Sequence, residues 1–170
     1  MGVQSVADPK IRRASEITYQ KIGGWLILCA IGLILYPVQT LVSLFTELLP
    51  ALSSEHWSAF TSAASPAYHP LLAPLVVAEL VGNLFFLIFS ICLAVFFFQQ
   101  RKYVPKLIIS FLIANLIFVG IDYFVTQYII IRPSSINVDA TINFVRTAAA
   151  GIVWIPYFVF SKRVGRTFVK

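Results

Sequence analysis

Four long apolar runs constrain this chain more than any other feature of its sequence. They cover residues 22–45, 71–98, 107–131 and 141–160, and each reaches the length of about 20 residues that a helix needs to cross a bilayer. In hydrocarbon every backbone N–H and C=O must be paired within its own segment, so such runs form helices. The sequence therefore predicts an all-α fold, an integral membrane four-helix bundle made by residues 22–160.

Composition supports the same class. Of the 170 residues, 59% are hydrophobic and 12% are charged, and the mean hydropathy is +0.85. A soluble fold of this length has too little interior to hide so much apolar surface. The first run is also longer than the segment of about 7–15 apolar residues in a cleavable signal peptide. We therefore expect it to be a retained membrane anchor.

Basic residues set the expected topology. The segment 1–21, the turn after the second run and the tail 161–170 are rich in lysine and arginine, whereas the opposite side has Arg132 alone. Such an excess marks the cytoplasmic side. We expect both termini in the cytoplasm, with residues 46–70 forming an external loop. The cytoplasmic basic residues are Lys10, Arg12, Arg13, Lys21, Arg101, Lys102, Lys106, Lys162, Arg163, Arg166 and Lys170.

Charged residues inside the runs give the candidate site. Arg146 lies in the fourth run, Glu79 in the second and Asp122 in the third. A guanidinium stays charged and is costly in hydrocarbon unless it is compensated. At about 1.5 Å per residue from the cytoplasmic end of each run, Arg146 lies about 21 Å up, Asp122 about 22 Å and Glu79 about 28 Å. We expect Arg146 to pair with one of the acids in the outer part of the membrane.

Uncharged polar residues lie in the same layer, the outer part of the membrane, so several interpretations of this layer remain open. The layer can be an ion-pair network that holds the helices in register, or a pocket, open to the outside, for a small polar ligand, ion or lipid headgroup. One pairing with Arg146 leaves an excess carboxylate, which is a property that proton coupling needs. Catalysis by the two acids is a further interpretation, but Arg146 would neutralise one of them. The remaining residues of this layer are Gln39, Asn83, Asn143 and Thr147.

The sequence lacks the residues that other kinds of site would need. Cys29 and Cys92 lie within apolar runs, so we expect them to be small buried hydrophobic residues. His56 and His69 in the external loop are too few for a metal site, and no motif predicts a cofactor or an enzyme. The basic residues form no single groove, so nucleic acid is not an expected partner.

Residues at the ends of the runs fit the membrane interface. Trp25, Trp154 and Tyr157 are aromatic side chains near the cytoplasmic ends of the first and fourth runs, where such rings anchor helices at headgroup level. Lys162, Arg163 and Arg166 follow the fourth run. These basic side chains are expected to contact anionic lipid.

Two stretches resemble a known family. KIGGWLILCAIGLILYP at Lys21–Pro37 and WIPYFVFSKRVGRTF at Trp154–Phe168 are similar to the opening and closing motifs of a bacterial family of four-span inner-membrane proteins, catalogued as domain of unknown function 2569. The resemblance covers residues from about Lys21 to Phe168. It implies four helices and a bacterial cytoplasmic membrane, and it brings no substrate.

The expected function is therefore non-enzymatic. We expect an accessory or interaction protein of the bacterial inner membrane, with a charge-paired pocket in the outer half of the bundle. Its expected partners are membrane lipids and either another membrane protein or further copies of the chain. The alternative is an ion- or proton-coupled transporter of small solutes that acts as an oligomer, since four helices rarely enclose a complete path.

Overall fold

The chain folds into four long helices that are apolar enough to cross a membrane. The computed structural model describes residues 22–66, 68–129 and 138–169, and within these ranges every regular element is helical. The predicted segment 1–21, the end of the third run at 130–131 and the short loop with Arg132 lie outside the described residues. The prediction of an all-α membrane bundle is confirmed.

The first crossing is a continuous helical path of three elements. It comprises α2 (Trp25–Ser43), the π-helix η1 (Leu44–Leu48) and α3 (Leu49–Ala51). A short helix, α4 (Ser54–Thr61), follows outside it. The other crossings are α5 (Leu72–Phe98), α6 (Val104–Ile129) and α7 (Val138–Phe160), and the chain then forms α8 (Lys162–Thr167).

Several helix boundaries differ from the predicted ones. Residues 46–51, predicted as the start of the external loop, continue the first helix, because Leu44 and Leu48 pack on Val76 of α5 and keep this segment against the bundle. The third helix begins at Val104 rather than at 107, with Pro105 in its first turn, where proline costs no hydrogen bond. The fourth helix begins at Val138 rather than at 141.

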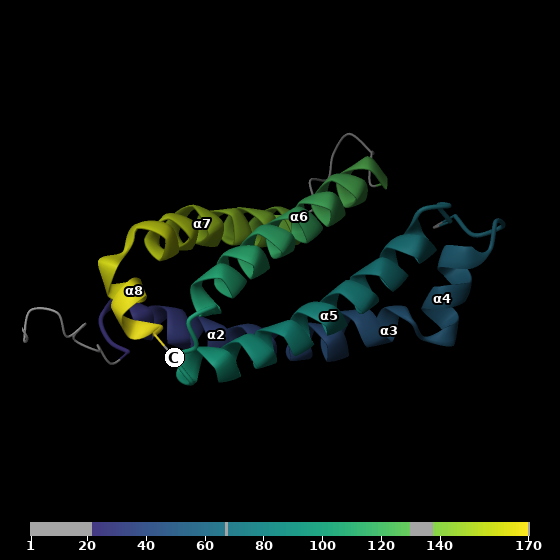
Figure 1. Ribbon diagram of the computed structural model, residues 1–170. Coiled ribbons are helices and arrows are strands. Elements are labelled where there is room, and N and C mark those ends of the chain that lie inside the picture. The colour runs from purple at the N-terminus through teal and green to yellow at the C-terminus, as the bar shows by residue number, and fades with distance from the viewer. Residues whose placement is uncertain (1–21, 67, 130–137, 170) are drawn as a thin grey trace, which may run out of the picture.

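The helices pack in sequence rather than as a closed ring. The most extensive contact is between α6 and α7, followed by the contacts of α5 with α2 and with α6. Figure 1 shows α6 and α7 running side by side, with α2 and α5 as a second pair. In the described part of the chain α2 and α7 share no comparable contact. Among the described helices, α2 and α7 are therefore not a closely packed pair.

The main core lies in the half of the bundle that contains the expected cytoplasmic ends. It is built from phenylalanine, leucine and other apolar residues of all four crossings. Large apolar side chains are also exposed along all four helices. A soluble protein does not expose so continuous an apolar surface, so these side chains face lipid or a partner helix.

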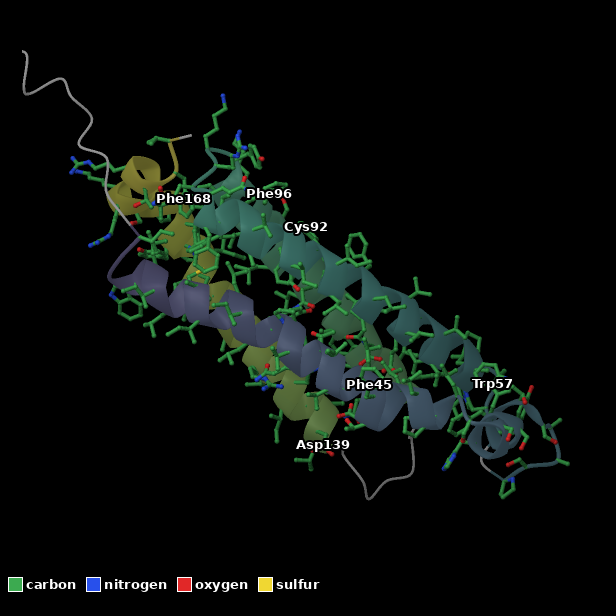
Figure 2. All side chains as sticks on the ribbon, turned by 90° about the horizontal axis from the view of Figure 1, so that it is seen from below. Phe45, Trp57, Cys92, Phe96, Asp139 and Phe168 are labelled. Carbon is green, nitrogen blue, oxygen red and sulfur yellow. The ribbon has the colours of Figure 1, made fainter. Side chains whose placement is uncertain are left out.

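Helix α8 folds back on this core. Val164 and Phe168 are buried in the core cluster, and the ring of Phe168 lies 5.2 Å from that of Phe97 on α5. Figure 2 shows Phe168 and Phe96 at one end of the molecule and Trp57 of α4 at the other. The basic tail therefore lies at the same end of the bundle as the basic turn between α5 and α6.

Candidate functional site: a carboxyl pair between two helices

A polar layer separates the main core from a smaller apolar cluster at the opposite end. The smaller cluster is formed by Leu44, Leu48 and Val76. In the layer below it, the Tyr36 hydroxyl donates a hydrogen bond to Oδ1 of the buried Asn115 at 3.2 Å. This bond links α2 to α6 near the middle of the membrane, since both residues lie about 17 Å from the cytoplasmic ends of their helices.

Two acidic side chains meet on the outer side of this layer. Glu79 of α5 and Asp122 of α6 are joined by a side-chain hydrogen bond. With the observed helix ends, Glu79 lies about 28 Å and Asp122 about 27 Å from the cytoplasmic ends of their helices. The earlier start of α6 thus brings Asp122 to the height of Glu79, above the 22 Å predicted from the sequence.

The hydrogen bond between these acids requires a proton. Ionised carboxylates have only acceptor atoms, so two of them cannot bond to each other, and one must be protonated. Oδ1 of Asp122 is also buried, and no donor reaches it from the described residues. The contact between the two acids therefore depends on a proton on one of them.

The packing next to the acids explains why they are close. Gly82 lies one turn from Glu79, and Phe118 lies one turn from Asp122. The ring of Phe118 occupies the space that a Cβ at Gly82 would need. The missing side chain of Gly82 therefore lets α5 and α6 approach closely beside the acid pair.

A third acid lies near the pair. Glu47, in the π-helix η1, accepts a hydrogen bond from the Ser43 hydroxyl at 2.8 Å, and its charge acts on Glu79. Glu47 is exposed, whereas Glu79 is partly buried.

Arg146 is not the partner of either acid. Its side chain is exposed on α7, and no ion pair with it occurs among the residues that the structure describes. The predicted pairing of Arg146 with Glu79 or Asp122 is therefore not observed. The physical reason is that the acids bond to each other. Arg146 also lies about 21 Å from the cytoplasmic end of its helix, closer to that end than either acid.

The other residues predicted for this layer are dispersed. Asn83 donates to the backbone carbonyl of Glu79 at 2.9 Å, and Thr147 donates to that of Asn143 at 2.9 Å, so both are satisfied within their own helices. Gln39 and Asn143 are exposed. The structure thus unites Glu79, Asn83 and Asp122 and leaves the remaining predicted residues outside this group.

The residues predicted for the membrane interface divide into two groups. Trp25 and the basic residues of α8, Lys162, Arg163 and Arg166, are exposed. Trp154 and Tyr157 are partly buried, and they pack against the main core. Trp154 also lies about 9 Å from the end of α7, which is deeper than the headgroup level at which we expected it.

Sequence reasoning missed Tyr36, Asn115 and Glu47 as members of this region. The sequence does place Asn115 on the same helix face as Asp122, seven residues before it, but Asn115 was not included in the predicted site. Glu47 could not be found in this way, because it was placed in a loop that is helical in the structure.

The described residues contain no group of three or more histidine, cysteine or acidic side chains arranged to hold a metal ion. A cavity of about 150 Å³ adjoins Tyr36, and neither carboxyl of the pair lines it. The chemistry that this arrangement offers is thus the uptake and release of a proton.

This architecture defines a multi-pass membrane protein with four crossing helices and a pair of acids in contact between the second and third. The chain belongs to the family described as Protein of unknown function (DUF2569), which it matches over residues 19–169. The resemblance inferred from its two end motifs is confirmed. No significant match was found among curated proteins or among solved structures.

Proposed function

We propose that this protein is a non-enzymatic accessory protein of the bacterial cytoplasmic membrane that takes up and releases a proton at Glu79 and Asp122. The observation that carries the proposal is the hydrogen bond between these two carboxyl groups. In the orientation predicted from the basic residues, the pair lies on the outer side of the membrane. It would therefore respond to the pH outside the cell.

Loss of the proton would act on the packing of α5 against α6. Two carboxylates would then face each other in a low dielectric, close to Glu47. The close contact between Gly82 and Phe118 leaves little room for them to separate without movement of the helices. A partner protein that contacts the outer ends of α5 and α6 would sense this movement. This supports an interaction protein whose contact surface depends on protonation.

The alternative function is proton-coupled transport by an oligomer. The acid pair suits it, because a translocated proton needs a group that binds it inside the membrane. In a single chain, however, the described core below Asn115 is made of apolar side chains with the buried Ser90, whose hydroxyl bonds to the Leu87 carbonyl. A path across the membrane would therefore have to run between chains.

Infrared spectroscopy tests the proton directly. Purified protein in lipid is compared at pH values around neutrality, and the carbonyl stretch of a protonated carboxyl is followed. We expect this band in the wild type at neutral pH and its loss in both Glu79→Gln and Asp122→Asn. Glu47→Gln is the control and should retain the band. A wild type without the band at any pH at which it is folded would refute the proposal.

Proton flux separates the two functions. Protein in proteoliposomes is given a pH gradient, and the internal pH is followed with a dye. The accessory function predicts the same leak as in protein-free liposomes. A flux that disappears in Glu79→Gln would favour transport, whereas a partner that co-purifies in mild detergent in a pH-dependent manner, without flux, would favour the accessory function.

A further inference from the structure

The side of the bundle between α2 and α7 contains an apolar groove. The cavity of about 150 Å³ lies between α2 and α7, and its floor is formed by residues of α5 and α6. On the α2 side it is lined by Leu28, Gly32 and Tyr36, and on the α7 side by Ala150 and Trp154. Space for a side chain remains open at Gly32, where an added Cβ would meet nothing within 4 Å. The groove is therefore an opening in the protein surface at membrane depth.

Arg146 lies on α7 one turn outward of the residues that line this groove. It precedes Ala150 by one helical turn and Trp154 by two, so all three residues lie along the same stripe of α7. Helix α7 runs from the outer side inward in the predicted topology. Helical side chains lean toward the helix N-terminus, so the guanidinium leans outward. From about 21 Å up the helix it can approach the outer headgroups.

The guanidinium needs an anion from outside the chain. It cannot lose its proton, and a charged side chain at this depth is costly without compensation. Glu79 and Asp122 bond to each other, and no acid among the described residues pairs with Arg146. A phosphate group is well suited, because its oxygens match the fork of guanidinium donors.

We propose that the groove between α2 and α7 holds an acyl chain of an anionic phospholipid from the outer leaflet, with its phosphate on Arg146. The order of the two features carries the assignment: a cation lies toward the outer headgroups, and an apolar channel begins below it near the bilayer centre and continues inward. This matches the order of headgroup and chain in one lipid molecule. The single positive charge of Arg146 favours an anionic lipid over a zwitterionic one.

Trp154 provides a reporter inside the groove. A variant with Trp25→Phe and Trp57→Phe keeps Trp154 as the only tryptophan. It is reconstituted in phosphatidylcholine vesicles that contain a fixed fraction of phosphatidylglycerol or phosphatidylcholine with brominated acyl chains, which quench tryptophan on contact. We expect an apparent preference of about fivefold for the brominated phosphatidylglycerol, the ratio that one lipid charge near the surface provides.

Two substitutions test the two parts of the site. Arg146→Gln should abolish the preference and make both brominated lipids quench equally. Ala150→Leu should fill the groove and reduce quenching by both lipids, whereas Ala149→Leu, the same change at an exposed position that does not line the cavity, should leave the wild-type values. Circular dichroism of each variant verifies that the helices are retained.

Three outcomes would overturn the proposal. Equal quenching by the two lipids in the otherwise unmodified reporter chain would exclude selection of the anionic headgroup, and this measurement needs no change in the groove. A preference that survives in Arg146→Gln would assign it to other basic residues. Equal effects of Ala150→Leu and Ala149→Leu would show that the chain does not enter the groove, as is expected if a second copy of the protein covers it.

Discussion

The carboxyl groups of Glu79 and Asp122 are hydrogen-bonded across the interface of α5 and α6. Both helices carry these acids at nearly the same height, and no cation of the described residues lies between them. The bond between the two acids persists only as long as one proton remains on the pair. The bond therefore couples helix packing to pH in a part of the protein that is otherwise apolar.

We expect the stability of the protein to decrease as the pH rises. The bond between Glu79 and Asp122 needs a proton on one of the acids, so it is lost once the pH is high enough to ionise both, and stability falls with it. The loss should be about 2 kcal/mol, the value of a hydrogen bond with a charged partner. Unfolding by sodium dodecyl sulfate at several pH values measures it. Asp122→Asn should flatten the curve, and an equally steep curve in that variant would contradict the prediction.

We expect Gly82→Ala to destabilise the protein and to separate the acids. The new methyl group would overlap the ring of Phe118, and such overpacking typically costs about 1–3 kcal/mol. Gly120→Ala is the matched control, because its Cβ would meet only Phe144, at an ordinary 3.5 Å. Both variants are compared by the same unfolding assay. Combination with Phe118→Leu, which removes the overlapping ring atoms, should restore part of the loss.

We expect Phe168→Ala to release α8 from the bundle. Phe168 is 4% exposed and packs on Phe97, and truncation of a buried phenylalanine costs about 3–5 kcal/mol. Phe160→Ala is the control, since Phe160 is 81% exposed at the end of α7. Protease cleavage in the tail should accelerate only in Phe168→Ala. Equal cleavage of both variants would mean that the contact with Phe97 does not hold the tail.

We expect external labelling of α4 and not of the turn between α5 and α6. Positively charged residues follow α5 and α7, so these ends should be cytoplasmic. After replacement of Cys29 and Cys92 by serine, His56→Cys should react with a membrane-impermeant maleimide on intact cells, whereas Lys102→Cys should react only after permeabilisation. The reverse pattern would place the acid pair on the cytoplasmic side.

The sequence was sufficient to predict the class of fold, because a run of about 20 apolar residues has few alternatives to a membrane helix. It also placed Glu79 and Asp122 in one layer, since helical rise converts position into height. It could not identify their partner. The face on which a helix meets its neighbour depends on the order of packing in space, and α7 packs on α6 with a face that leaves Arg146 exposed.

The helical extension of the first crossing was missed for a related reason. Residues 46–51 contain Glu47 and Pro50, which interrupt the apolar pattern and favoured a loop. Tertiary contacts of Leu44 and Leu48 with Val76 outweigh this local tendency. Glu47 thereby lies near Glu79, so the site contains a third acid that the four apolar runs did not predict.

Double-mutant cycles distinguish the observed pairing from the predicted one. If the acids bond to each other, the stability changes of Glu79→Gln and Asp122→Asn should be coupled by about 0.5–3 kcal/mol, as for residues in direct contact. The changes caused by Arg146→Gln and Glu79→Gln should instead add to within about 0.5 kcal/mol, because the two groups share no bond. The same should hold for Arg146→Gln with Asp122→Asn. Strong coupling of Arg146 with either acid, and weak coupling between the acids, would show that the protein in the membrane uses the ion pair and not the shared proton.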